Sequence, residues 1–423
     1  MKSIEIGAGY HCGLLGGKLG HSFSPLIHSR LADYEYLLYE RTAEEVPDFL
    51  RSGSCNGLNV TIPYKKTAFS ICDELSPIAQ KTGSVNTIVR LPDGRLKGYN
   101  TDYFGFSYLV HKAGFDVSAG KILVLGSGGA SVTVCAVLKD LGAKEVVVIS
   151  RSGPNDYDNI YTLHQDAQYL VNTTPVGMYP NTGAAPVDLS RFPDCAGVID
   201  LIYNPARTKL LLDAERAGAA AVNGLSMLVA QAKQSCELFT GRPISDSTIE
   251  EIAGEIEALT KNIILIGMPG CRKSTVGANL AHVLNRPFVD IDDVIESRIA
   301  MTICDFFKAY GEKAFRKIET EVLAEYAKGS GQIIATGGGI VTIPENLPLM
   351  RQNGTIVLLN RPLHELPVAG RPISMSCDLV RLEQERLPLY QSWKDVSVKS
   401  GNPEETTRSI ISLLFPQQQA SEG

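Results

Sequence analysis

Residues 121–134 have the sequence KILVLGSGGASVTV, which is an apolar run of strand length followed by a glycine-rich turn and the start of a helix. Gly126 permits a tight turn and Gly128 lets the backbone approach a pyrophosphate, while the first amides of the helix supply donors and a favourable dipole. A tight turn without a ligand is the alternative, but the strand–turn–helix order favours a nucleotide site. Strand and helix patterns alternate along the whole chain, which predicts an α/β protein with parallel sheets built from βαβ units.

The strand expected at 145–150 ends in Ser150, Arg151 and Ser152. A site that takes NAD usually places an acidic residue here, where it binds the ribose 2′-hydroxyl. A cation flanked by hydroxyl groups suits a 2′-phosphate instead. The sequence therefore favours NADP as the dinucleotide.

A second strand–loop–helix unit, IILIGMPGCRKSTVG, spans residues 263–277. It nearly matches G-x-x-x-x-G-K-[ST], in which backbone amides cradle phosphates, the lysine reaches the transferred group and the hydroxyl holds Mg²⁺. Gly267, Lys273 and Ser274 fit this pattern. Arg272 stands where the second glycine is expected, and its side chain crowds the loop if that position needs backbone angles that only glycine adopts readily.

The composition limits the classes of protein that remain. The chain has 423 residues, with 40 Lys and Arg against 46 Asp and Glu. Its length predicts two or three domains, and its mild acidic balance argues against a nucleic-acid partner or an anionic membrane. No apolar run of 18 residues occurs, and the first residues lack the apolar core of a signal peptide. Nine cysteines without a CxxC pair indicate reduced thiols in a cytoplasmic protein.

The boundary between the two nucleotide-binding halves is predicted near residue 260. Residues 223–241 are expected to form a helix with Asn223 as its cap, and a second helix over 247–259 meets the next strand within a few residues. No Gly/Ser-rich or Pro-rich spacer separates the halves. Residues 417–423 are expected to be a frayed tail.

Polar clusters interrupt the apolar segments of the first hundred residues. HSFSP contains Ser22 and Ser24, for which a helix cap is the ordinary explanation. NVTIPYK predicts a strand with one polar face, followed by Lys65, which would otherwise be a solvated surface charge. Asn86 and Asp102 lie at apparent strand ends, where α/β proteins place their ligands.

Together these stretches resemble shikimate dehydrogenase over about residues 10–258. In chain order, the shared motifs are HSFSP, NVTIPYK, VNT, NTDxxG, GSGGAS, VNTTPVGM, DLIYNP and NGLSMLVAQA. The resemblance implies that Lys65 is the acid/base residue and Asp102 its partner. It implies that the substrate is held by Ser22, Ser24, Thr61, Asn86, Asp102, Tyr203 and Gln231. It also implies an NADP site lined by Gly126, Ser127, Gly128, Gly129, Ala130, Ser150, Arg151, Ser152, Leu201 and Gly224.

The reaction implied for this half is the reduction of 3-dehydroshikimate to shikimate by NADPH. An ammonium group beside a carboxylate in a cleft can donate the proton that the ketone oxygen needs. The resemblance implies a substrate domain made of residues 1–100 and 226–258, and a Rossmann-like NADP-binding domain over 101–225. The stretch 151–172 is short for this family, which predicts a trimmed nucleotide domain.

Five further motifs follow the second loop. VDIDDVIE contains Asp290 and Asp292, whose ordinary explanation is a solvated turn, and GEKAFRKIE contains Arg316, which could belong to an exposed helix with Glu–Arg pairs. Three consecutive glycines at 337–339 suggest a backbone close to a ligand. The last two motifs are GRPI and RLPLY.

With these motifs, the second half resembles shikimate kinase over about residues 261–415, with 416–423 as the tail. The resemblance implies a parallel α/β domain of the P-loop type in which shikimate is bound by Asp292, Arg316, Gly338 and Arg386. ATP would be bound by Gly270, Cys271, Arg272, Lys273, Ser274 and Thr275. Mg²⁺ would be held by Ser274 and, through water, by Asp290. Lys273 and Arg371 would neutralise charge on the phosphoryl group, Asp292 would orient the attacking 3-hydroxyl, and residues 362–378 would form a mobile lid.

The two resemblances point to one shared metabolite and predict a fused enzyme for two consecutive steps of the shikimate pathway. Two alternatives stay open. In one, Arg272 leaves the second half able to bind but not to turn over. In the other, the first half is a quinate/shikimate dehydrogenase that prefers NAD. The expected ligands are NADP(H), ATP, Mg²⁺ and small substrates, with neither nucleic acid nor membrane, and the chain is expected to be a monomer or homodimer.

Overall fold

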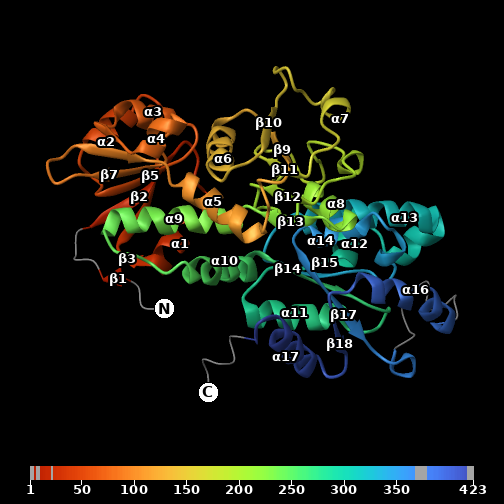
Figure 1. Ribbon diagram of the computed structural model, residues 1–423. Coiled ribbons are helices and arrows are strands. Elements are labelled where there is room, and N and C mark those ends of the chain that lie inside the picture. The colour runs from red at the N-terminus through yellow and green to blue at the C-terminus, as the bar shows by residue number, and fades with distance from the viewer. Residues whose placement is uncertain (1–3, 6–9, 21, 367–378, 417–423) are drawn as a thin grey trace. The chain divides into compact units, whose positions relative to one another are not determined.

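The structure is a computed structural model that describes all residues except 1–3, 6–9, 21, 367–378 and 417–423 (Figure 1). The chain divides into two compact units. The first takes its described residues from 1–176, 185–203 and 213–255, and the second takes them from 177–184, 204–212 and 256–423. The finer domain boundaries inferred from the sequence stay predictions.

A six-stranded sheet with the order β4-β2-β5-β7-β8-β6 belongs to the first unit. Its strands are β2 (His11–Gly16), β4 (Glu35–Glu40), β5 (Gly57–Val60), β6 (Glu74–Leu75), β7 (Thr87–Arg90) and β8 (Leu96–Tyr99). β7 runs antiparallel to β5 and to β8, whereas the other pairs are parallel. The sequence prediction of parallel sheets throughout was wrong here. Asp93 and Gly94 allow the sharp reversal, because Gly94 adopts a φ of +87° in the short connection.

The helices that accompany this sheet are α1 (Ser24–Leu31), α2 (Val46–Arg51), α3 (Lys65–Ile71), α4 (Pro77–Thr82), α9 (Leu225–Thr240) and α10 (Ser247–Thr260). A parallel pair of short strands, β1 (Ile4–Glu5) and β3 (Ala32–Asp33), lies apart from it. Helix α9 packs against α1 and α5 (Asp102–Ala113) and buries Val229, Ala232 and Cys236 (Figure 1). α9 therefore contacts one helix near the start of the chain and another that begins at residue 102.

A second sheet of the first unit is five-stranded and wholly parallel, with the order β10-β9-β11-β12-β13. Its strands are β9 (Lys121–Leu125), β10 (Glu145–Ile149), β11 (Tyr169–Asn172), β12 (Gly197–Asp200) and β13 (Ala220–Asn223). The accompanying helices are α5, α6 (Gly129–Asp140), α7 (Ile160–Leu163), η1 (Leu189–Arg191) and α8 (Lys209–Ala217). β9 leads directly into the 126–130 turn and α6, as the sequence predicts.

Asn223 does not cap α9, contrary to the sequence prediction. It is the last residue of β13, paired with Asp200 of β12, and the N-cap position belongs to Gly224. The Asn223 Oδ1 still accepts the Leu225 N–H at 3.0 Å. Because Asn223 belongs to β13, the N-cap of α9 lies one residue later than predicted, but the hydrogen bond from the Leu225 N–H to the Asn223 side chain is kept.

The second unit contains a five-stranded parallel sheet with the order β15-β16-β14-β17-β18. Its strands are β14 (Asn262–Ile266), β15 (Phe288–Asp290), β16 (Ile333–Ala335), β17 (Gly354–Asn360) and β18 (Val396–Lys399). The helices are α11 (Lys273–Leu284), α12 (Ile291–Ile299), α13 (Ile303–Ala327), η2 (Ile340–Thr342), α14 (Asn346–Arg351), η3 (Leu363–Glu365), α16 (Leu379–Trp393) and α17 (Pro403–Leu414). α10 ends at Thr260, two residues before β14 begins, which is the close junction that the sequence predicts. The apolar strands and the inner faces of these helices share one buried core.

Two further observations concern the residues that the structure describes. Their eight cysteines are all free thiols. None of the helices in these ranges is both long and apolar enough to cross a membrane.

Candidate active sites

The first unit contains a cavity of about 500 Å³. Every side chain predicted for substrate binding or proton transfer in this half lines it. These residues are Ser22, Ser24, Thr61, Lys65, Asn86, Asp102, Tyr203 and Gln231. They come from segments that lie far apart in the chain, between the start of α1 and the middle of α9.

Lys65 and Asp102 form an ion pair in this cavity. Each residue opens a helix, α3 and α5 respectively, and the distance from Lys65 Nζ to Asp102 Oδ2 is 2.6 Å. The two side chains are 29% and 19% exposed, so Lys65 is not the solvated surface charge that was the alternative. The positive end of the α5 dipole favours the carboxylate. An ammonium held by a carboxylate is thus open to a ligand in the cavity.

Ser22 and Ser24 do not cap helix α1 in the usual way. Phe23 occupies the N-cap position and no side chain caps the helix, although the Ser22 Oγ accepts the Ser24 N–H at 3.2 Å. The Tyr203 ring is tilted against the Phe23 ring at a centroid distance of 6.1 Å, and burial raises the pKa of Tyr203. The phenol therefore stays protonated and can donate, as the serine hydroxyls can.

A buried polar network, which the sequence reasoning missed, lies against the cavity, and one of its members, Asn59, also lines it. It consists of Asn59, Thr87, Thr101 and Ser235, whose side chains contact one another between 2.8 and 3.1 Å. The sequence pattern places Asn59 and Thr61 on the polar face of one strand, and in the structure β5 is buried on both sides, with Asn59 5% exposed. The VNT and NTD motifs contained the signal, because polar residues beside apolar strands must find buried partners.

The predicted dinucleotide turn has the backbone that the sequence implies. Gly126 has a φ of +105°, and a Cβ there would lie 2.8 Å from Thr174 Cγ2, so only glycine fits. Gly128 is the N-cap of α6, and residues 127–130 are exposed at the N-terminus of this helix. The arrangement fits a pyrophosphate, since the helix amides and dipole favour an anion there.

The remaining residues that are predicted to bind NADP lie at two places. Ser150, Arg151 and Ser152 follow β10, whose last residue pairs with Leu125 beside the glycine turn. Leu201 and Gly224 line the 500 Å³ cavity, and a Cβ at Gly224 would collide with the Leu201 carbonyl oxygen. The predicted cofactor residues thus extend from the turn to the substrate residues.

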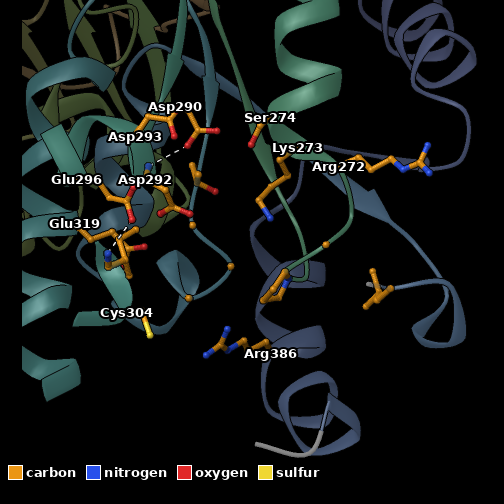
Figure 2. Close-up of a pocket in the computed structure, with 18 of the residues that line it drawn as sticks. Arg272, Lys273, Ser274, Asp290, Asp292, Asp293, Glu296, Cys304, Glu319 and Arg386 are labelled. Carbon is orange, nitrogen blue, oxygen red and sulfur yellow. Dashed lines mark hydrogen bonds between the residues drawn. The ribbon is translucent and has the colours of Figure 1, made fainter. Parts of the chain in front are cut away.

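A cavity of about 900 Å³ lies in the second unit (Figure 2). The predicted residues that line it are Gly270, Arg272, Lys273, Ser274, Thr275, Asp290, Asp292, Arg316, Gly338 and Arg386. Cys271 is fully buried outside this lining, and its amide donates to the Met268 carbonyl at 3.2 Å. Arg371 and residues 367–378 of the predicted lid lie outside the described residues.

Arg272 adopts the left-handed backbone conformation, with φ +69° and ψ +30°, at the N-cap of α11. Glycine adopts this conformation most easily, so the expectation that position 272 needs glycine-like backbone angles is confirmed. The side chain does not fill the cavity, because it extends away from the acidic residues in Figure 2 and its Nη1 donates to the Gly401 carbonyl at 3.1 Å. Ser400 Oγ donates to the Cys271 carbonyl at 2.6 Å. The loop is therefore fixed to the turn that follows β18.

Lys273 opens helix α11 and its side chain is buried against the same loop. Its Nζ donates to the carbonyls of Gly267 at 2.9 Å and Met268 at 3.2 Å. Figure 2 shows Lys273 and Ser274 facing a group of acidic side chains across the cavity. Cation and hydroxyl thus lie where a phosphate group could reach both.

The acidic side of the cavity is built from β15 and α12. Asp290 is not in a solvated turn, since it is 9% exposed and caps α12 by accepting the Asp292 N–H at 3.0 Å. Burial, together with the charges of Glu319 and Asp290, raises the pKa of Asp292 to about 7. No group of three His, Cys, Asp or Glu side chains in the described ranges forms a metal centre by itself. Ser274 and Asp290 nevertheless supply the hard oxygen donors that Mg²⁺ takes together with phosphate oxygens and water.

Arg316 is not part of an exposed helix face. It is 6% exposed on α13 and pairs with the fully buried Glu319 at 2.6 Å and with Glu312 at 3.0 Å. Burial lowers the pKa of Arg316, but the two carboxylates outweigh this effect and hold it above its ordinary value. A permanent, oriented guanidinium therefore faces the cavity.

The three glycines at 337–339 are explained by close approach of side chains. A Cβ at Gly337 would collide with Glu319, one at Gly339 would collide with Arg316, and one at Gly338 would lie 2.7 Å from Pro269. The Tyr390 hydroxyl also donates to the Gly338 carbonyl. The backbone at 337–339 thus completes the wall around Arg316, beside the buried Arg386 of α16.

Comparison with known proteins matches the two cavities to two different protein families. Residues 14–88 match the family model of the shikimate dehydrogenase substrate binding domain, and residues 269–414 match the family model of shikimate kinase. The chain is 36% identical over 266 residues to shikimate dehydrogenase (NADP(+)) of Clostridium perfringens, covering 58% of this chain and 97% of the relative. It is 37% identical over 260 residues to shikimate dehydrogenase (NADP(+)) of Methanopyrus kandleri, covering 54% of this chain and 89% of the relative.

Solved structures give the same result for the N-terminal part. A chorismate mutase/shikimate 5-dehydrogenase fusion protein from Clostridium acetobutylicum has a TM-score of 0.56 at 37% identity, covering 59% of this chain and 97% of that chain. Shikimate 5-dehydrogenase from Thermus thermophilus, in complex with NADP(H) and shikimate, has a TM-score of 0.53 at 31% identity, covering 58% and 99%. Quinate dehydrogenase from Corynebacterium glutamicum, in complex with NAD, has a TM-score of 0.53 at 26% identity, covering 57% and 98%.

Proposed function

The chain belongs to the shikimate dehydrogenase family and also contains a shikimate kinase domain, and we propose that it catalyses two consecutive reactions on the shikimate skeleton. In the first, 3-dehydroshikimate and NADPH give shikimate. In the second, shikimate and ATP give 3-phosphoshikimate. The observation that supports this most is that both cavities contain complete sets of the side chains that two independent resemblances assign to one shared compound.

In the first reaction, Lys65 is the proton donor to the ketone oxygen. Asp102, at 2.6 Å from the Lys65 ammonium, orients it toward the substrate. NADPH, when bound at the 126–130 turn, supplies the hydride. The Ser22, Ser24 and Tyr203 hydroxyls donate to the carboxylate, while Thr61, Asn86 and Gln231 contact the ring hydroxyls. A pocket that hydrogen-bonds each hydroxyl rejects analogues that lack one.

NADP is the proposed dinucleotide because Arg151 stands between two hydroxyl residues after β10. The competing candidate is a quinate/shikimate dehydrogenase that uses NAD, and the similarity to a quinate dehydrogenase with bound NAD favours it. Initial rates with NAD⁺ and NADP⁺ at the same shikimate concentration decide between them. A clear preference for NAD⁺ would contradict the NADP assignment.

In the second reaction, the amides and cations of residues 270–275 bind the ATP phosphates, and Mg²⁺, when bound to Ser274 and to water on Asp290, neutralises part of their charge. Arg316 and Arg386 clamp the substrate carboxylate, which suits the bidentate geometry of guanidinium. Asp292 orients the attacking 3-hydroxyl and accepts its proton. Its pKa, raised to about 7 by burial, suits proton acceptance near neutral pH.

A second candidate for this half is binding without turnover, and the strained backbone at Arg272 is the observation that favours it. The test is ADP release from Mg-ATP by the full chain, with and without shikimate and in the absence of NADP. Shikimate-dependent release at an ordinary kinase rate, roughly 1–100 per second, is expected. Binding of nucleotide without such release would leave the dehydrogenase reaction alone.

A further inference from the structure

We propose that Ser235 is a positioning residue of the first site, which fixes the Asn86 amide and the segment around Gln231 in the geometry that selects the substrate. The inference rests on the proposed function, because it takes Asn86 and Gln231 to be substrate-binding residues. Ser235 itself is fully buried and does not line the cavity.

Ser235 joins four segments of the first unit. Its Oγ accepts from Asn59 Nδ2 of β5 at 2.8 Å and donates to the Gln231 carbonyl, one turn earlier in α9, at 2.9 Å. It also lies 2.9 Å from Thr87 Oγ1 of β7 and 3.1 Å from Thr101 Oγ1, directly before α5. β5, α5 and α9 each contribute residues to the cavity wall, and so does Asn86, directly before β7.

The network fixes which way the Asn86 amide faces. The Thr101 backbone N–H donates at 2.7 Å to the Asn86 side chain. Since a backbone N–H can only donate, the atom that it meets is the amide oxygen. Thr87 Oγ1 and Thr101 Oγ1 both lie 3.2 Å from this oxygen as well. Asn86 therefore offers its NH₂ group to the cavity as a donor.

Ser235 determines which hydroxyl groups of this network donate hydrogen bonds and which accept them. Its own proton goes to the Gln231 carbonyl, which has none to give, so the Ser235 oxygen is left as an acceptor. It can then accept one proton from Thr87 or Thr101 in addition to the Asn59 amide proton. Without the Ser235 oxygen, the threonine protons are left with Asn86 Oδ1, with each other or, for Thr101, with Gln231 Oε1 at 3.5 Å, and one Asn59 N–H loses its acceptor.

The consequence is specific to substrate binding. If the amide of Asn86 rotates, it presents an oxygen where the substrate hydroxyl now meets a donor. A displacement of about 1 Å in a positioning group can cost as much as 100-fold in rate. The side-chain hydrogen bonds of this network join Asn59, Thr87, Thr101 and Ser235, and none of them involves a residue of the described dinucleotide turn at 126–130, so binding of NADP⁺ is expected to be unaffected.

The test is the kinetics of shikimate oxidation by the full chain with the substitution Ser235→Ala. We expect the KM for shikimate to rise about tenfold or more, while the KM for NADP⁺ stays within twofold. The matched control is Thr240→Ala, which removes a hydroxyl from the same helix that donates to the Cys236 carbonyl at 2.8 Å but is not part of the network. This control is expected to leave the KM for shikimate unchanged.

A double mutant separates positioning from a general loss of structure. In Asn86→Ala, one of the two groups that Ser235 positions is absent and only the segment around Gln231 remains, so adding Ser235→Ala is expected to raise the KM by less than threefold further, which is a smaller factor than in the wild-type background. If Ser235→Ala does not fold, Ser235→Cys, which has a similar volume and a weaker acceptor, is expected to raise the KM in the same direction.

The outcomes distinguish this inference from the proposed function. A wild-type KM in the Ser235→Ala chain, or a full additional effect in the Asn86→Ala background, would overturn the positioning role while shikimate oxidation itself stands. A wild-type chain that does not oxidise shikimate with either dinucleotide would overturn the proposed function, and this inference with it.

Discussion

The two cavities are expected to bind the same compound with different kinds of side chain. In the first, hydroxyl and amide groups surround a single ion pair between Lys65 and Asp102. In the second, Lys273, Arg316 and Arg386 face several carboxylates. The two proposed reactions account for the difference, since reducing a ketone needs one proton at one oxygen, whereas moving a phosphoryl group places several negative charges together. The chemistry, and not the substrate alone, determines the donor set.

The largest effect is expected at the single ion pair. Lys65→Met removes the proton donor and should lower kcat for shikimate oxidation by roughly 10²–10⁴-fold, the usual contribution of general acid–base catalysis. The rate is measured from NADPH formation at saturating shikimate, with Lys66→Met, an exposed neighbour, as the control for a lost positive charge. A decrease of less than tenfold would show that Lys65 is not the acid/base residue.

The next largest effect comes from comparing two residues that are proposed to hold the substrate carboxylate, one in each cavity. Arg316→Ala truncates one partner of a buried pair and leaves the Glu319 carboxylate unpaired, so kcat/KM for phosphorylation should fall by roughly 100-fold or more, in keeping with a cost of about 2–5 kcal/mol. Ser24→Ala removes a hydrogen bond from an uncharged donor to the carboxylate and should lower kcat/KM for oxidation by only about tenfold.

Steady-state kinetics on both reactions of each variant provides the internal reference. Arg298→Ala, which removes an exposed arginine paired with Glu325, is the control for the second half. Equal losses for Ser24→Ala and Arg316→Ala would contradict the distinction between a neutral and a charged site.

The buried titratable groups of the two units are expected to give opposite pH dependences. Burial lowers the pKa of His28 to about 3, so the folded protein keeps the imidazole neutral while the unfolded chain protonates it, and stability is lost as pH falls from 6.5 toward 3. The pKa of Asp292 is raised to about 7, so the folded protein keeps this carboxyl protonated while the unfolded chain ionises it. Stability is therefore lost as pH rises from about 4 to 7. Relative to wild type, His28→Phe should gain stability at pH 5 and Asp292→Asn at pH 8, each on the order of 2–4 kcal/mol at most. Urea unfolding at both pH values measures the difference in the free energy of unfolding between each variant and wild type. A difference that does not change with pH would rule out the assigned titration.

The smallest effect is expected at Arg272. The loop already has the left-handed angles at this position, so Arg272→Gly should leave the amide cradle in place and change the rate of ADP release by less than about threefold. The contact with Gly401 is lost, but the Ser400 contact with the loop remains. An increase above tenfold would instead mean that Arg272 damages the wild-type loop.

Much of the fold could be predicted from the local sequence. The strands Lys121–Leu125 and Asn262–Ile266 have the bounds that their apolar runs indicate, because a buried strand between a polar start and a glycine turn leaves little freedom. Lys65 and Asp102 could be named from their motifs. Their contact, however, joins two helix starts that are 37 residues apart, and only the folded sheet shows it.

Other features depend on tertiary contacts that no local pattern contains. Ser235 lies four residues after Gln231 and could be any buried helix serine, while its partners belong to β5, β7 and the start of α5. Likewise, the glycines at 337–339 suggested a ligand, but the atoms that exclude a Cβ belong to Glu319, Pro269 and Arg316. A sequence shows that space is scarce at such positions, and the structure shows what fills it.

The most direct test of two consecutive reactions in one chain starts from 3-dehydroshikimate and Mg-ATP, with NADPH present or omitted. NADPH consumption and ADP release are recorded together on the purified full chain. ADP is expected to appear only when NADPH is present, and its amount is expected to approach one ADP for each NADPH oxidised. NADPH oxidation without ADP, or ADP release that does not depend on NADPH, would contradict this expectation.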